Sequence, residues 1–146
     1  MIEPSVLVVD DEAQFVETLI KRLDKRGVKV RAAHSGQEAL DALAGSGATN
    51  TDVVVLDVKM PGMDGLETLA LIKEQHPLVE VIMLTGHATV ESAIEGMKHG
   101  AYDYLMKPCD LDVLMAKLNA AAVKKREHEA KILEARATMI SLRRGD

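Results

Sequence analysis

Three acidic residues stand where apolar, strand-like runs of the sequence end. Asp57 directly follows the run 53–56, and Asp10 and Asp11 follow a second run at 6–9. If these runs form neighbouring parallel strands, their carboxyl ends bring the three carboxylates together at one edge of a sheet. Like charges at such short range resist ionising together unless a cation compensates them. Because all of these ligands are oxygen atoms, the sequence predicts a site for Mg²⁺ or Ca²⁺ rather than for zinc.

A hydroxyl group and a lysine complete this candidate site. Thr85 ends the strand-like run 80–84, and Lys107 follows another run at 102–105. A carboxylate can attack phosphorus and form an acyl phosphate, a transfer that depends on charge neutralisation more than on acid–base catalysis. Asp57 is the predicted nucleophile, because it ends a central strand and the Pro- and Gly-containing loop after it leaves room in front of the carboxylate.

Each of these residues also has an ordinary structural interpretation. The acid pair at 10 and 11 could cap a helix. Thr85 could simply end a strand, and Lys107 could lie on the surface. Coincidence at so many strand ends is a poor explanation, so we prefer the functional interpretation.

Strand-like and helical patterns alternate along the whole chain. Apolar runs occupy 5–9, 28–33, 53–56, 80–84 and 102–105, and helical spacings lie between them at 15–23, 36–44, 66–72 and 90–97. Ser35 and Glu38 predict a capping box at the start of the second helix. This order predicts a doubly wound α/β fold, in which helices cover both faces of a five-stranded parallel sheet. Ligands of such folds bind at the carboxyl ends of the strands.

An extended C-terminal helix is predicted after the last strand, because residues 111–142 contain neither Gly nor Pro. Spacings of three and four predict a heptad seam that is weakened at Lys125 and His128, made of Leu111, Leu114, Leu118, Ala121, Lys125, His128, Ile132, Ala135, Met139 and Leu142. The first turns should pack on the sheet. The remainder should pair with another helix or form a solvated extension. We therefore expect a domain at 1–121 and a helical extension or linker, a possible coiled coil, at 122–146.

Composition limits the classes of function. The chain has 146 residues, of which 47% are hydrophobic, and this suits one domain with an appendage. No apolar run approaches the roughly 20 residues of a membrane span, and the N-terminus lacks a signal pattern. We therefore expect a cytoplasmic protein with no membrane partner, and the single cysteine, Cys109, fits a reducing compartment. Aromatic residues make up only 2%, which argues against direct nucleic-acid binding by stacking.

The motifs around the candidate site resemble the receiver domain of two-component response regulators over about residues 4–120. The resemblance rests on Asp10-Asp11, on Asp57 followed by Met60-Pro61-Gly62-Met63-Asp64-Gly65, on Thr85-Gly86, on Tyr104 and on Lys107-Pro108. It implies a flavodoxin-like fold of the receiver type. It also implies that Asp57 accepts a phosphoryl group from a sensor histidine kinase. Mg²⁺ would then be held by three carboxylates and one backbone carbonyl, those of Asp10, Asp11, Asp57 and Lys59.

The resemblance assigns roles to three further residues. Thr85 and Lys107 would contact the phosphoryl oxygens. Tyr104 would be an aromatic switch that turns inward when Thr85 moves. The peptide bond between Lys107 and Pro108 would be cis.

The segments 57–65 and 85–110 look most like the receivers of the nitrogen-regulation class of transcriptional activators. The chain would then be a single-domain regulator or, as the apolar residues at 132–133 and 139–140 favour, an excised receiver with its linker. We expect a phosphorylation-gated switch that controls dimerisation or an output domain in transcription regulation. A homodimer would form through the C-terminal helix or through the face of the fourth helix, fifth strand and fifth helix, near Ile94, Met97, Tyr104 and Leu114.

Other functions compete with this interpretation. A phosphohydrolase with an aspartate nucleophile would need a second acid two residues later, where Lys59 stands, so turnover of external substrates is not expected. A nucleotide-binding fold would need a Gly-rich turn in place of residues 10–13. A stand-alone interaction module or a phosphorelay intermediate would act without a DNA-binding output. Lys59 and His87 should border the mouth of the site, where they either alter the phosphoryl lifetime or are solvated loop residues.

Overall fold

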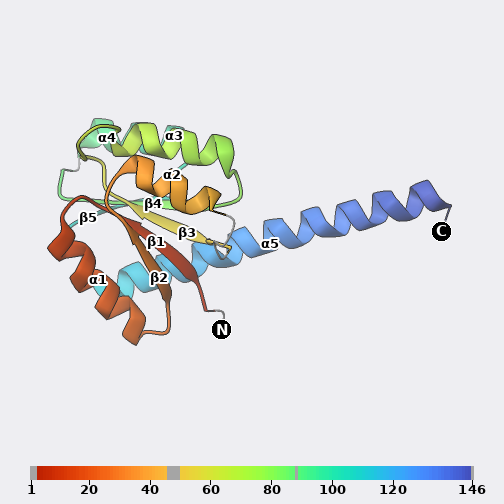
Figure 1. The fold of residues 1–146 in the computed structure, drawn as a ribbon, viewed down its shortest axis with the longest axis horizontal. Helices are drawn as coiled ribbons and strands as arrows, with labels where there is room; N and C mark the ends of the chain where they lie inside the picture. The colour runs from red at the N-terminus through yellow and green to blue at the C-terminus, as the bar shows by residue number, and fades with distance from the viewer. Residues whose placement is uncertain (1–2, 46–49, 88, 146) are drawn as a thin grey trace.

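The computed structural model describes residues 3–45, 50–87 and 89–145. Its elements, in chain order, are β1 (Ser5–Val9), α1 (Ala13–Lys25), β2 (Lys29–Ala33), α2 (Gly36–Ala44), β3 (Val53–Leu56), α3 (Gly65–Gln75), β4 (Glu80–Thr85), α4 (Val90–Lys98), β5 (Asp103–Met106) and α5 (Leu111–Arg144). All strand pairs are parallel, and the strand order is β2-β1-β3-β4-β5 (Figure 1). The predicted doubly wound, flavodoxin-like α/β fold is confirmed, with each strand end within one residue of its predicted place.

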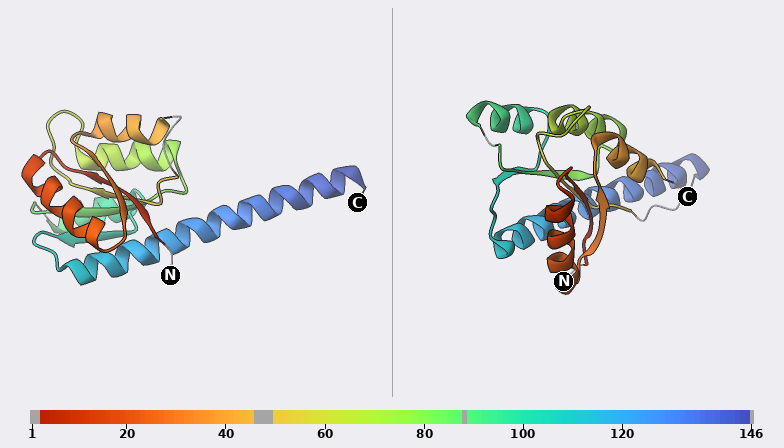
Figure 2. Two further views of the ribbon diagram at one scale, coloured as in Figure 1. Left: turned by 60° about the horizontal axis from the view of Figure 1, so that its bottom comes forward. Right: turned by 60° about the vertical axis from the view of Figure 1, so that its left-hand side comes forward.

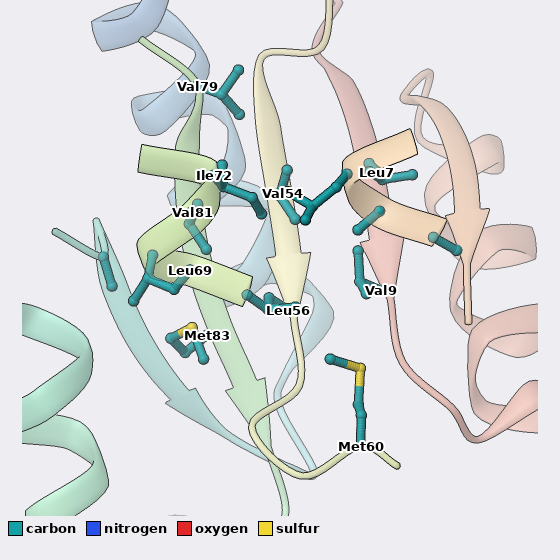
Figure 3. Packing of buried hydrophobic residues seen from close by; sticks show 14 of the residues in the cluster. Leu7, Val9, Val54, Leu56, Met60, Leu69, Ile72, Val79, Val81 and Met83 are labelled. Atoms are coloured by element: carbon teal, nitrogen blue, oxygen red, sulfur yellow. The ribbon is translucent and has the colours of Figure 1, made fainter. Parts of the chain in front are cut away.

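Two apolar layers enclose the sheet. Helices α2, α3 and α4 cover one face, and α1 and the first half of α5 cover the other (Figures 1 and 2). Every residue of β1, β3 and β4 is buried, as expected for central parallel strands that are covered on both sides. Alternate residues of these strands point to opposite layers. One layer, drawn in Figure 3, includes Leu7, Val54, Leu69, Ile72, Val81 and Met83, and the other includes Val6, Val8, Leu23, Val55, Ile82 and Leu118.

Side-chain caps fix the starts of several helices. Ser35 accepts a hydrogen bond of 3.1 Å from the backbone N–H of Glu38, so the predicted cap of α2 is present. The predicted capping box is nevertheless wrong in its second half, because the Glu38 carboxylate lies 3.4 Å from the Ser35 hydroxyl and accepts from that group. A complete capping box occurs instead at α4, between Thr89 and Ser92. Both hydroxyl side chains are short enough to bond the backbone N–H group of the other residue.

Helix α5 is 34 residues long and projects far beyond the domain (Figures 1 and 2). Its buried residues are Leu114, Leu118, Ala121, Ala122 and Lys125, whereas every described residue from 131 onwards is exposed. Two predictions therefore need correction. Lys125 is not a weak position in a seam between helices, because it packs against its own domain. Leu114 is only 2% exposed in the core and does not lie on an outer face.

None of the helices in the described ranges combines the length and the apolar character that a membrane crossing requires.

Candidate functional site

Three carboxylates meet at the carboxyl ends of β1 and β3. One oxygen atom from each of Asp10, Asp11 and Asp57 lies within 4.8 Å of the others. Val9 pairs with Leu56 in the parallel register, and the backbone N–H of Asp57 donates to the Val9 carbonyl at 3.0 Å. The acids follow these paired residues, so strand pairing itself brings them together. Asp10 and Asp57 are each 2% exposed, whereas Asp11 is open to solvent.

The surroundings of Asp57 disfavour its charged form. Burial raises the pKa of this carboxyl group, and the neighbouring Asp10 raises it further. A hydrogen bond from the Thr85 hydroxyl, the charge of Lys107 and a 2.9 Å hydrogen bond from the Val58 backbone N–H act in the opposite direction, but the pKa still lies above its ordinary value. A second cation beside this carboxylate would therefore stabilise the folded protein.

Lys107 reaches the same cluster from the end of β5. Its ammonium lies 2.6 Å from Oδ2 of Asp10, 3.5 Å from Glu12 and 4.0 Å from the centre of the Phe15 ring. Burial lowers the pKa of Lys107, but the hydrogen bond to Asp10 and the surrounding carboxylates more than offset this, so the pKa is raised. The side chain is only 13% exposed, which excludes the surface interpretation. The peptide bond between Lys107 and Pro108 is cis, as predicted.

Thr85 is fully buried at the end of β4. Its hydroxyl donates to Asp57 and accepts a 3.0 Å hydrogen bond from the backbone N–H of His87. A movement of Asp57, or of a group attached to it, would therefore shift Thr85 and, through its hydrogen bond with His87, the loop that leads to α4. The capping interpretation of the acid pair is wrong, because the N-cap residue of α1 is Glu12, where no side-chain cap is formed. Asp10 instead accepts a 2.9 Å hydrogen bond from the backbone N–H of Glu12.

An open depression of about 450 Å³ gives access to Asp57. It is lined by Asp11, Glu12, Asp57, Lys59, Met60, Pro61, Asp64 and His87. Lys59 and His87 are exposed and border this depression, as predicted. Behind the depression, Gly65 packs closely against the backbone of Asp57. A side chain at this position would overlap the Asp57 carbonyl.

Tyr104 lies apart from the acid cluster, on the half-buried strand β5. Its hydroxyl is 2.7 Å from Oγ of Ser92 in the first turn of α4. Its ring faces Gly96 one turn later in α4, where a Cβ atom would lie 3.4 Å from the ring. In this structure the tyrosine therefore connects the sheet to α4.

Sequence reasoning missed several residues that shape the site. Glu12 and Phe15 were assigned no contact with Lys107, and Ser92 was given no contact with Tyr104. Glu12 directly follows the acid pair, so its place in the chain could have suggested a role. Phe15 and Ser92 sit within ordinary helical patterns, and their contacts come from residues far away in the sequence.

Comparison with known proteins identifies the family. A family profile described as the response regulator receiver domain matches residues 6–119. The DNA-binding transcriptional regulator NtrC of Klebsiella pneumoniae is 39% identical over 78% of this chain and 24% of that protein. The transcriptional regulatory protein ZraR of Salmonella typhimurium is 38% identical over 94% of this chain and 30% of that protein. The chain thus spans less than a third of the length of these relatives.

Solved structures agree with this assignment. A response regulator receiver domain protein from Clostridium thermocellum superimposes with a TM-score of 0.78 at 36% identity, covering 84% of this chain and 97% of that one. NtrX from Brucella abortus, solved in complex with ADP, gives a TM-score of 0.79 at 32% identity over 90% of this chain and 30% of that one. The chain therefore belongs to the response regulator receiver domain family.

Proposed function

We propose that the chain is a phosphorylation-gated switch whose Asp57 accepts a phosphoryl group from a histidine of a sensor kinase. One observation carries the proposal. The buried Asp57 carboxylate stands beside two further carboxylates, accepts a hydrogen bond from Thr85, and faces an open depression. An acyl phosphate formed there would meet a lysine and a hydroxyl that are already in place.

The proposed reaction is a direct phosphoryl transfer. A carboxylate oxygen of Asp57 attacks phosphorus, an O–P bond forms, and the P–N bond to the donor imidazole breaks. The electron pair of that bond stays on the imidazole nitrogen, which then takes up a proton. Such a transfer requires positioning and charge neutralisation, because most of the transition-state charge lies on the phosphoryl oxygens.

The donor set fits Mg²⁺, which binds oxygen ligands and supplies charge neutralisation when bound. Asp10, Asp11 and Asp57 would hold the ion together with the backbone carbonyl of Lys59. Thr85 would donate to one phosphoryl oxygen and Lys107 would pair with another. Lys107 is near its target already, since its ammonium is bound to a carboxylate of the same cluster.

The output would follow from a shift between two packings of the domain. Movement of Thr85 toward the phosphoryl group would pull on the loop to His87 and allow Tyr104 to turn inward. The surface beside Tyr104 carries exposed apolar side chains suited to a partner, those of Ile94, Met97 and Met106.

The partner at the output surface would be a second copy of the chain. The homodimer would use this α4–β5–α5 face or the exposed apolar residues of α5, which include Ile132, Leu133, Met139, Ile140 and Leu142. We keep the division into a receiver at 1–121 and an extension at 122–146. Transcription regulation is the proposed output, because the curated relatives are transcriptional regulators. The step would occur in the cytoplasm, and the domain would turn over no external substrate.

Reaction with phosphoramidate, a small donor with a P–N bond, tests the proposal. The expected result is one phosphoryl adduct that hydroxylamine removes, as it does an acyl phosphate. The Asp57→Asn protein should form no adduct. A hydroxylamine-resistant adduct, or an equal adduct on Asp57→Asn, would contradict the proposal.

A further inference from the structure

Two buried acidic residues lie at the edge of the sheet opposite the candidate site. Asp52 precedes β3 and is 1% exposed, and Glu80 begins β4 and is 4% exposed. The backbone N–H of Glu80 donates to the Asp52 carbonyl at 3.1 Å, so the two residues are neighbours. Neither has a role in the proposed phosphoryl transfer. Buried carboxylates require compensating partners. Lys73 of α3 lies 3.9 Å from Glu80, and the Ser5 backbone N–H donates to Asp52 at 2.9 Å. The other cationic partners of the two acids come from α5.

Three consecutive basic residues of α5 face these two acids. Arg126 binds the Asp52 carboxylate through two nitrogen atoms, at 3.2 Å and 2.8 Å, and also donates to the carbonyl of Glu3 at 2.8 Å. Lys125 lies 3.5 Å from Asp52. Lys124 lies 3.6 Å from Glu80. The paired nitrogens of Arg126 fix a direction as well as a distance.

Lys125 adds to the free energy needed to separate α5 from the two acids. It is only 2% exposed, and its ammonium lies 2.9 Å from Glu129 in addition to its contact with Asp52. Burial raises the pKa of Asp52, but hydrogen bonds from Arg126 and from the backbone N–H of Ser5 outweigh it, so the pKa is lowered and the acid stays charged. Lifting α5 from the sheet would remove both cationic partners of this carboxylate, Lys125 and Arg126, and leave it with the hydrogen bond from Ser5, and breaking such a buried ion pair is destabilising.

We propose that Asp52 and Glu80, together with Lys124, Lys125 and Arg126, form an ionic clamp that makes α5 rigid with the receiver as far as Arg126 and fixes the direction in which the rest of the helix projects. The apolar contacts of α5 with the sheet end just before the clamp, at Ala122. The clamp therefore acts at the root of the projecting segment, where a helix without it would be free to bend away. This inference does not depend on the proposed phosphoryl transfer.

The position of the clamp connects it to the candidate site. Strand β3 is four residues long, with Asp52 directly before it and Asp57 directly after it. One buried strand thus joins the acid cluster to the root of the projecting helix. If the domain changes its orientation, the extension would move with it as one rigid body, without local unfolding of α5.

The test measures the orientation of the extension by pulsed electron spin resonance. Spin labels at Lys21→Cys in α1 and Ala137→Cys in α5, with Cys109→Ser to remove the native thiol, report one distance between the domain and the extension. Labelled protein is diluted with unlabelled protein so that pairs between molecules do not contribute. We expect one narrow distance distribution. We expect this narrow distribution to be lost in Arg126→Ala and in Asp52→Asn, and to be intermediate in width in Arg126→Lys, which keeps the charge but not the paired nitrogens.

Arg136→Ala is the matched control, because it removes the same side chain from the same helix at an exposed position beyond the clamp. Hydrogen exchange of residues 118–128 should quicken in the clamp variants and stay unchanged in this control. Asp52→Asn changes a buried side chain and could prevent folding. The Arg126 side chain is 40% exposed, so Arg126→Ala tests the same ion pair in a protein that should still fold. An equally narrow distribution and equal exchange in Arg126→Ala and Arg136→Ala would overturn the clamp. A failure of all of these proteins to accept a phosphoryl group would refute the proposed function and leave the clamp result standing.

Discussion

The ammonium of Lys107 lies 2.6 Å from Oδ2 of Asp10, although the two residues are 97 positions apart in the chain. This contact closes the candidate site, because it brings the loop after β5 onto the acids that follow β1 and β3. It also means that the cluster carries one positive charge of its own. A bound cation and Lys107 would therefore share the compensation of three carboxylates.

The contact predicts that Lys107→Met makes the protein dependent on Mg²⁺ for stability. Loss of the ammonium leaves Asp10 and Asp57 less compensated, so the free energy of unfolding should fall by about 2 kcal/mol, less than for a fully buried pair. Mg²⁺ should restore more stability to this variant than to the wild type. Urea unfolding with and without Mg²⁺ measures both effects. Lys21→Met, which removes an exposed lysine, is the control, and equal stability of all three proteins would contradict the prediction.

The raised pKa of Asp57 predicts a pH-dependent gain from Asp57→Asn. An acid whose pKa is raised on folding destabilises the native state at every pH at which it is ionised. As the pH falls through the pKa of Asp57 in the folded protein, the carboxylate is protonated and the wild type regains this free energy of unfolding. The gain is complete below the pKa of aspartate in the unfolded chain, about 3.9. Without a cation, Asp57→Asn should therefore be more stable than the wild type at pH 7 to about 8, and the difference should shrink in acid. A melting temperature clearly below that of the wild type at neutral pH would count against a clustered site.

A side chain at Gly65 should destabilise the folded protein. A Cβ atom there would overlap the carbonyl of Asp57 and crowd Val58, and the backbone would have to move. Gly65→Ala should lower the free energy of unfolding by about 1–3 kcal/mol, as overpacking does. Gly86→Ala is a suitable control, because its Cβ atom would meet nothing within 4 Å. Thermal unfolding of the two proteins compares them, and similar losses would show that the close approach has no energetic role.

Self-association should depend on the projecting part of α5 and on phosphorylation. Ile132 and Met139 are exposed and stand seven residues apart on one face of the helix. The double variant Ile132→Ser with Met139→Ser should dimerise at least about tenfold more weakly, since each truncated apolar contact costs on the order of 1 kcal/mol. Sedimentation velocity before and after treatment with acetyl phosphate measures this. Lys131→Ser with Thr138→Ser is the control on the adjacent face, and unchanged sedimentation of the treated wild type would refute the switch in association.

The parts of the site that follow strand ends could be predicted from the sequence. The apolar runs that form the central strands are clear in the sequence, and they end at Asp10, Asp57 and Thr85. A parallel sheet places the carboxyl ends of its strands at one edge. Lys107 could be located in the same way, and its charge suggested a role in neutralising phosphoryl oxygens. The role of Tyr104 came only from the resemblance to a family. The helix boundaries were equally accessible, because Gly, Pro and hydroxyl residues mark them.

The contacts that depend on distant pairs could not be predicted. Asp52 reads as a loop residue before a strand, and its partner Arg126 is 74 positions away. Lys125 reads as a defect in a heptad pattern, because periodicity gives spacing along one helix but does not show which surface that helix covers. Phe15 reads as a core position, and nothing in the local pattern reveals that an ammonium packs on its ring.

The central claim is that Asp57 accepts a phosphoryl group in a reaction that depends on the acid cluster and Mg²⁺. Intact-mass spectrometry after incubation with acetyl phosphate, with and without Mg²⁺, tests it most directly. The account predicts a single phosphoryl adduct on the wild type in the presence of Mg²⁺, and none on Asp57→Asn. Absence of any adduct on a protein whose circular dichroism shows an intact fold would contradict the account and favour an interaction module that acts without phosphorylation.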